Sequence, residues 1–343
     1  MKVGIRIPGA GPWAGPEAIA EISQFAEKAG FDSLWMTDHV ALPTKVDTPY
    51  PYTSDGKFLW APETPYLDCL TSLTWAAAAT ERVELGTSCL ILPWRPLVQT
   101  TKTLVSIDVL SRGRLTVAIG VGWMKEQFDI LGAPFKDRGR RVTEMINAMR
   151  HMWTEDEVDF TGDFYDLHHF KMYPKPVRGT IPVWFAGYSE ASLRRIAAIG
   201  DGWHPLAVGP EDYAGYLATL TSYVEQAGRD MSEITLTARP LRTAPYNAET
   251  IERTAPRASP TSSATPRSST RRSPRRSKSC RSWPRPFCPP PTSCPDSDVT
   301  LMQASTDKVP LVLDGELVES STGARFDTVN PATGDVLASV ARQ

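Results

Sequence analysis

An acid and an imidazole stand side by side in the stretch GFDSLWMTDHV, residues 30–40. Asp38 and His39 follow Leu34-Trp35-Met36, an apolar run that is typical of a short buried strand. A histidine at a strand end can take or give a proton near neutral pH, and a neighbouring carboxylate can fix its tautomer or raise its pKa. The pair therefore predicts acid–base chemistry. The alternative is that Asp38 caps the next segment and His39 bonds only to backbone.

The composition indicates a globular protein with a hydrophobic share of 41% and a charged share of 22%. Its 343 residues suffice for one large barrel or two ordinary domains. The five cysteines form no CxxC pair and have no zinc-type spacing with histidine, so we expect no metal and a reducing, cytoplasmic location. The N-terminus is broken by Gly and Pro too often for a signal peptide, and no apolar run approaches a bilayer-spanning length.

Two periodicities alternate over residues 1–245 and predict the elements that must position this pair. Strands are expected at 2–7, 33–37, 83–92, 115–122, 182–187, 201–206 and 234–241, with helices at 16–30, 66–82, 96–113, 138–153, 189–200 and 211–228, and a hairpin around Gly162-Asp163. Repeated βα units imply a parallel sheet, either open and doubly wound or closed as an eight-stranded barrel. In both, the carboxyl ends of the strands form the functional edge, where Asp38 and His39 would face a cleft.

Five stretches in order resemble one family, the luciferase-like flavin and deazaflavin oxidoreductases. They are AEKAGFDSLWMTDHV, ATERVELGTSCLILPWRPL, LSRGRLTVAIGVGWMKEQFDILG, FKDRGRRVTE and PVWFAGYSEASLRRIAAIGDGW. The resemblance implies a TIM barrel, and GVGW followed by Glu126 is most similar to the branch that uses coenzyme F420, with FMN as the alternative. It also implies that His39 lies beside the hydride-accepting carbon of the cofactor, acting as acid, base or electrostatic stabiliser, and that Asp38 orients it.

The same resemblance implies several residues that bind the cofactor. A non-proline cis peptide between Ser88 and Cys89 would support the cofactor ring, although an ordinary buried strand is the alternative. Gly120 and Gly122 would let backbone approach a flat ring, although they also fit a tight turn. Trp123 would wall the pocket, and Glu126 would hydrogen-bond to cofactor or substrate.

The stretch FAGYSEAS predicts a phosphate site, and two other stretches carry weaker signals. Gly187, Tyr188 and Ser189 lie where a strand meets a helix start, whose free N–H groups bind phosphate. Helix capping alone explains Ser189 equally well. His204, in DGWHPL, ends a strand and is expected to line the substrate pocket. His168-His169 lacks further ligands at metal spacing.

The chain departs from the family after residue 247, where an eighth βα unit is expected. Of the fifty residues 251–300, 36 are Ser, Pro, Arg or Thr, a composition that predicts disorder over 248–301. GC-rich DNA read out of frame yields the same composition, so we interpret this segment as a frameshift rather than a tail that binds RNA. Residues 302–343 resemble the N-terminus of an aldehyde dehydrogenase without its catalytic parts. The alternating pattern of VPLVLDG favours an antiparallel hairpin over a barrel strand.

The resulting expectation is an incomplete luciferase-like barrel over residues 1–247. It would transfer a hydride between F420 and a small organic substrate, with Asp38, His39 and Glu126 in the catalytic site. The alternatives are an FMN-dependent monooxygenase, supplied with reduced flavin by a separate reductase, or an inactive cofactor-binding relic. The resemblance also allows a homodimer, and we expect neither a membrane nor a nucleic-acid partner.

Overall fold

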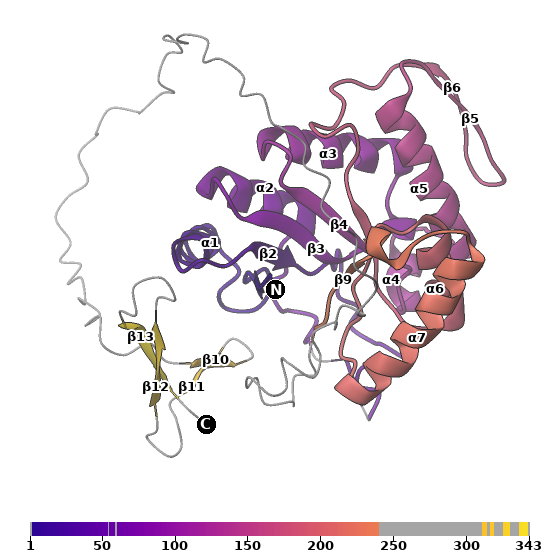
Figure 1. Ribbon diagram of the computed structural model, residues 1–343. Coiled ribbons are helices and arrows are strands. Elements are labelled where there is room, and N and C mark those ends of the chain that lie inside the picture. The colour runs from indigo at the N-terminus through magenta and orange to yellow at the C-terminus, as the bar shows by residue number, and fades with distance from the viewer. Residues whose placement is uncertain are drawn as a thin grey trace, which may run out of the picture.

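The computed structural model describes residues 2–53, 55–58 and 60–239, together with the backbone of four short strands between residues 311 and 341. The Ser/Pro/Arg/Thr-rich segment 248–301 and the position of the expected eighth unit lie outside the described residues. Helices surround the sheet on its outer side (Figure 1).

Among the described residues the sheet has seven parallel strands, as the periodicity predicts. They are β1 (Gly4–Arg6), β2 (Ser33–Met36), β3 (Glu84–Ile91), β4 (Leu115–Gly120), β7 (Val183–Phe185), β8 (Gly202–Trp203) and β9 (Thr235–Leu236). They pair in the order β1-β2-β3-β4-β7-β8-β9. This is an open half-barrel of the luciferase-like TIM-barrel type, with β1 and β9 as its two edges. The choice between an open doubly wound sheet and a barrel type is thereby settled.

Six of the seven α-helices match the predicted ones. The seven are α1 (Pro16–Lys28), α2 (Cys69–Ala79), α3 (Leu97–Leu110), α4 (Lys125–Ile130), α5 (Arg138–Thr154), α6 (Glu190–Ile199) and α7 (Pro210–Gln226), accompanied by the 3-10 turns η1 (Leu92–Trp94) and η2 (Met231–Glu233). Pro16 at the first position of α1 has no backbone N–H, so this position leaves no unsatisfied donor. The sequence did not predict α4, because six residues are too few to show a helical period.

The core lies between the sheet and its helices. All six residues of β4 are buried, which explains why its sequence LTVAIG has apolar residues facing both sides, with Thr116 as its one polar side chain. A side chain at Gly86 would meet the ring of Trp35 at 2.3 Å, so this glycine makes room for the indole on the neighbouring strand. Among the described residues, none of the helices is both long and apolar enough to cross a bilayer.

In the part of the chain that the structure describes, three hairpins stand outside this sheet. The predicted one pairs β5 (Val158–Thr161) with β6 (Asp166–Phe170), and its turn donates the N–H groups of residues 163–165 to Glu144. Beyond the barrel, β10 (Leu311–Leu313) pairs antiparallel with β11 (Glu316–Val318), as the pattern of VPLVLDG predicts. Likewise β12 (Arg325–Val329) pairs antiparallel with β13 (Val336–Ala341).

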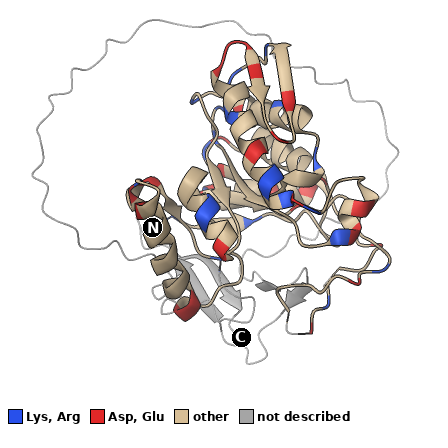
Figure 2. Ribbon diagram, turned by 90° about the vertical axis from the view of Figure 1, so that its right-hand side faces the viewer, with Lys and Arg blue, Asp and Glu red and all other residues tan. Residues whose placement is uncertain are grey.

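Positions of positively and negatively charged residues are interspersed along the helices in Figure 2. The pair Arg194–Glu190 on α6, at 2.8 Å, has both partners more than half exposed. Such surface pairs contribute little to stability. The ion pair between Arg95 and Asp38 is different, because the Asp38 side chain is 0% exposed.

Candidate functional site

The carboxyl ends of the strands meet at one edge of the half-barrel, and the predicted site residues lie there. Parallel register places Met36 opposite Thr87 and Ile91 opposite Gly120, so the ends of β2, β3 and β4 are adjacent. The residues that follow these strands therefore share one rim.

His39 is held by one hydrogen bond and two aromatic rings. The amide Nε2 of Gln127, on α4, donates to His39 Nδ1 at 2.8 Å. The rings of Phe58 and Tyr66 lie 5.1 and 5.2 Å from the imidazole. Burial lowers the pKa of His39 to about 4, and the bond from Gln127 only partly opposes it. His39 is consequently a neutral imidazole at pH 7.

Asp38 does not orient His39, and that expectation is wrong for this structure. Its Oδ2 accepts the Ile91 N–H at 2.9 Å, and its Oδ1 accepts Arg95 Nη2 at 2.6 Å. Burial raises the pKa of Asp38, while Arg95 and the Ile91 N–H oppose that rise. We interpret the contact as a buried ion pair that ties the end of β2 to the end of β3. Asp38 and His39 point to different partners because consecutive side chains of an extended segment face opposite ways.

Trp123 belongs to an aromatic cluster that the loop between β2 and α2, residues 37–68, brings over the rim. Its ring lies 5.0 Å from Tyr50 and 5.4 Å from Phe58, and Phe58 in turn contacts His39. Tyr52 also contacts Tyr50, with ring centres 5.3 Å apart. The pocket wall that was predicted for Trp123 is thus formed by Trp123 together with Tyr50 and Phe58 of the loop.

Glu126 binds this loop. Its Oε1 accepts the N–H groups of Asp47 and Thr48 at 2.8 and 2.9 Å, and the Thr48 hydroxyl at 3.1 Å. Burial acts to raise the pKa of Glu126, but these hydrogen bonds outweigh it and lower the pKa overall. Glu126 therefore remains ionised and fastens the loop, and its Oε2 is buried without a hydrogen-bond partner among the described residues.

The peptide bond between Ser88 and Cys89 is cis, as the resemblance implied. Ser88 Oγ lies 2.9 Å from His204 Nε2 and 3.4 Å from Arg239 Nη1. Burial raises the pKa of the Cys89 thiol to about 12, so it is a poor nucleophile at neutral pH.

His204 is joined to three other side chains. Its Nδ1 lies 2.8 Å from Thr237 Oγ1, and that hydroxyl donates to the Trp203 carbonyl at 3.0 Å. The imidazole stacks on Trp35 with ring centres 4.7 Å apart. Burial, and secondarily the charge of Arg239, lowers the pKa of His204 to about 3. Both of its nitrogens are thus occupied by protein.

Gly120 and Gly122 are needed for packing against side chains. A Cβ on Gly120 would lie 2.9 Å from Ile91, and one on Gly122 would lie 2.7 Å from Phe128. Gly122 also has a φ of +80°, which favours glycine. The Arg138 guanidinium donates to the Gly122 carbonyl at 3.0 Å. The close contacts at this strand end are therefore with the protein itself.

The predicted phosphate segment forms a capped helix start. Ser189 is the N-cap of α6 and accepts the Ser192 N–H at 3.3 Å, as the capping interpretation requires. Gly187 has a φ of +94°, and its carbonyl accepts the Trp203 indole N–H at 2.9 Å. The ring of Tyr188 stacks on Tyr216 of α7 at 4.9 Å. The first N–H groups of α6 stay free of the side-chain cap.

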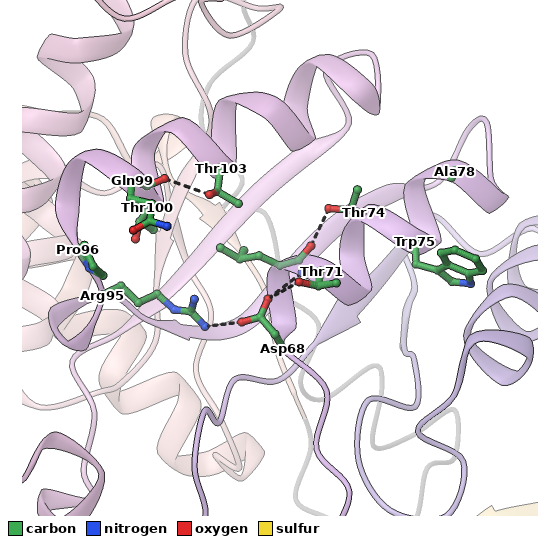
Figure 3. A pocket seen from close by; sticks show the side chains of 11 residues that line it. Asp68, Thr71, Thr74, Trp75, Ala78, Arg95, Pro96, Gln99, Thr100 and Thr103 are labelled. Atoms are coloured by element: carbon green, nitrogen blue, oxygen red, sulfur yellow. Dashed lines mark hydrogen bonds and ion pairs between the residues drawn. The ribbon is translucent and has the colours of Figure 1, made fainter. Parts of the chain in front are cut away.

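A groove of about 540 Å³ lies on the outer side of the barrel, between α2 and α3 (Figure 3). Arg95 and Asp68 meet at its edge with an ion pair of 3.2 Å, and Trp75 lies at its other end. None of the predicted site residues lines it. No group of three His, Cys, Asp or Glu side chains suitable for a metal occurs in the described part of the chain.

Four residues of the site were not predicted from the sequence. Gln127 and Arg95 carry no motif of their own, because their importance comes from His39 and Asp38, which are distant in sequence. Tyr50 and Phe58 could have been found from the sequence. Residues 50–66 are rich in aromatic side chains and lie between a predicted strand and a predicted helix, which indicates a loop that covers the site.

Sequence comparison shows which family of proteins this chain is similar to. The family model described as luciferase-like monooxygenase matches residues 1–280. An uncharacterized protein of Mycobacterium tuberculosis is 32% identical over 208 residues, covering 61% of this chain and 72% of its own length. An F420-dependent glucose-6-phosphate dehydrogenase of Amycolatopsis mediterranei is 31% identical over 194 residues, covering 55% and 53%. An FMNH2-dependent dimethylsulfone monooxygenase of Pseudomonas putida is 35% identical over 130 residues, covering 37% and 36%.

The fold has a counterpart among solved structures. The monooxygenase RslO1 from Streptomyces bottropensis superimposes with a TM-score of 0.56 at 22% identity, over 69% of this chain and 70% of that one. With a family model that spans most of the chain and a parallel half-barrel to match, this protein belongs to the luciferase-like monooxygenase family.

Proposed function

We propose that this protein is an F420-dependent oxidoreductase that transfers a hydride between the deazaflavin and a small organic substrate. The observation that carries the proposal is His39, a neutral imidazole at the end of β2 with Nδ1 bonded and Nε2 without a partner among the described residues. The 31% identity to an F420-dependent dehydrogenase supports the choice of cofactor.

The residues at the rim fit a flat, phosphorylated cofactor. Glu126 Oε2 and Gln127 Oε1 are buried polar atoms without hydrogen-bond partners in the described part of the chain, and such atoms are expected to meet a ligand or water. Aromatic rings supply apolar walls, while the start of α6 at Ser189 supplies N–H groups for phosphate. Both F420 and FMN satisfy this donor set.

When bound, F420 would supply a hydride donor or acceptor at C5 of its ring. His39 would hold a proton on its ring and share it in a hydrogen bond with the atom that gains charge during hydride transfer, since the ring is neutral and reaches the rim. The loop with Tyr50 and Phe58, fastened by Glu126, would exclude water from the reacting atoms. Asp38 and Arg95 would keep the ends of β2 and β3 together.

Cofactor titration tests this proposal directly. F420 and FMN are added separately to the purified chain, and binding is followed by calorimetry and cofactor fluorescence. We expect F420 to bind at least about tenfold tighter than FMN, a difference of about 1.4 kcal/mol. Trp123→Leu should weaken F420 binding, while the exposed-site control Trp13→Leu should not. Equal or tighter binding of FMN contradicts the choice of F420.

An FMN-dependent monooxygenase is the second candidate. It is favoured by the 35% identity to an FMNH2-dependent monooxygenase, which is higher than that to the F420-dependent relative but covers fewer residues. FMN-selective binding, followed by oxygen consumption when reduced FMN and a reductase are supplied, would establish it.

Activity also depends on how the open sheet is completed. In the described residues β1 and β9 are strand edges, and a barrel has none. We propose that the reading frame shifted near residue 247 and that the restored frame would encode the eighth βα unit. Restoring it should raise soluble yield and turnover. Unchanged yield and turnover would contradict the frameshift interpretation.

A further inference from the structure

We propose that Gln127 is a positioning residue that fixes the tautomer of His39, so that the imidazole offers an Nε2–H donor to a carbonyl oxygen or an oxyanion in the site. The catalytic consequence rests on the proposed function, whereas the tautomer itself does not. Nothing in the sequence around Gln127 marks this role.

The geometry begins with the donor. Gln127 lies on α4, which follows the end of β4, and its side chain is completely buried. Its amide Nε2 lies 2.8 Å from His39 Nδ1. An amide nitrogen can only donate, so Nδ1 must be the bare, accepting nitrogen. A neutral imidazole has one proton, which must then be on Nε2.

The opposite orientation of the amide is less favourable. In it Oε1 would accept from a protonated Nδ1, and the NH2 group would take the place of the buried Oε1, which has no partner among the described residues. Two buried N–H donors would then be unsatisfied, instead of one N–H donor and one carbonyl oxygen. Unsatisfied buried N–H groups are rarer and costlier than carbonyl oxygens that lack one partner.

No charged group competes for the ring. Asp38, next in the chain, is engaged by Arg95 and the Ile91 N–H. Tyr66, edge-on to the imidazole, shares a short hydrogen bond with Thr37, and burial raises its pKa so that the phenol stays protonated. Phe58, the other ring in contact, carries no charge. Gln127 is therefore the one side chain that hydrogen-bonds to His39 in the described part of the chain.

The consequence is that Nε2 of His39 acts as a hydrogen-bond donor and not as a base. With its proton on Nε2, His39 can donate to an acceptor atom but has no lone pair there to remove a proton from an alcohol. The site is thus suited to polarising a carbonyl or stabilising an oxyanion. The accepting atom belongs to the substrate or to the cofactor, and the shared chemistry is a hydrogen-bond acceptor that gains negative charge.

Nitrogen-15 NMR of the full chain, labelled at histidine, reads the tautomer without cofactor or substrate. The sequence has five histidines, so comparison with His39→Gln assigns the His39 signals. We expect a protonated Nε2 and a bare Nδ1 at pH 7 in the wild-type protein. In Gln127→Leu the Nδ1–H form should rise to a substantial fraction, whereas the exposed control Gln99→Leu should match wild type.

Gln127→Glu gives the complementary result. A carboxylate at this place should pull a proton to Nδ1 and raise the pKa of His39 by about one unit or more. A wild-type His39 protonated at Nδ1 would overturn the proposal, and so would identical tautomer populations in wild type and Gln127→Leu. Should the variants fail to fold, the wild-type spectrum alone decides. If the wild-type protein does not bind F420, the proposed function is contradicted. The tautomer of His39 is measured without cofactor, so that result does not affect the test of Gln127.

Discussion

Two histidines end two strands of the half-barrel, and they use their nitrogens differently. His39, after β2, has Nδ1 bonded to Gln127, and its Nε2 has no partner among the described residues. His204, after β8, has Nε2 bonded to Ser88 and Nδ1 bonded to Thr237, and it stacks on Trp35. Burial lowers the pKa of both rings, to about 4 and about 3.

The comparison teaches that a shifted pKa does not by itself mark a catalytic histidine. Both rings are neutral at pH 7 for the same reason, which is burial. What separates them is whether a nitrogen remains for a ligand. His204 has none, so its nitrogens are not available for proton transfer, and we assign it a structural role in joining β3, β8 and β9.

The largest expected effect is on turnover at His39. His39→Ala should lower turnover of the substrate converted by cofactor-loaded wild type by about 10²–10⁴-fold, the range covered by catalytic hydrogen-bond donors and general acids. Cofactor affinity should stay within a few-fold. His204→Ala, corrected for the folded fraction, should lose much less. Equal losses in both variants would remove the distinction between the two rings.

The next effect is on stability at His204. His204→Ala should reduce the free energy of unfolding by about 2–4 kcal/mol, because it opens a cavity beside Trp35 and leaves the Ser88 hydroxyl without its acceptor. Urea unfolding measures this, with His169→Ala as the control because the His169 side chain is 86% exposed. A change below about 0.5 kcal/mol would show that the network does not hold the strands.

The pH dependence of stability follows from the same two rings. Their pKa values lie below the ordinary 6.5, so between pH 6.5 and about 4 the unfolded chain binds protons that the folded chain does not. Stability should therefore be complete above pH 6.5 and fall as the pH drops towards 4, with His204 contributing further loss down to about 3. Urea midpoints measured across this range should change less steeply in His204→Ala. An identical slope would contradict a neutral, buried His204.

The smallest effect concerns the loop that covers His39. Glu126→Ala should release the N–H groups of Asp47 and Thr48 and speed tryptic cleavage after Lys45 and Lys57 several-fold. Peptide mass spectrometry follows both cuts, and Glu126→Gln, which keeps an acceptor oxygen, should behave as an intermediate. Unchanged cleavage in Glu126→Ala would mean that the aromatic contacts alone hold the loop.

Much of this protein could be predicted from periodicity. Seven strands and six helices occur where apolar residues recur at strand or helix spacing. Burial of one face stabilises the local structure whose period matches the spacing of the apolar residues. The position of Asp38 and His39 at a strand end followed from the same pattern. The aromatic content of residues 50–66 could also have indicated a covering loop.

Only the tertiary structure decided which polar groups meet. Gln127 lies 88 residues from His39, Arg95 lies 57 from Asp38, and His204 lies 116 from Ser88. Periodicity records which side chains face inward, but hydrogen bonds depend on rotamers and on which strand ends are adjacent. For that reason the sequence determined that His39 would stand at the rim, and the fold decided that Gln127, rather than Asp38, would be its partner.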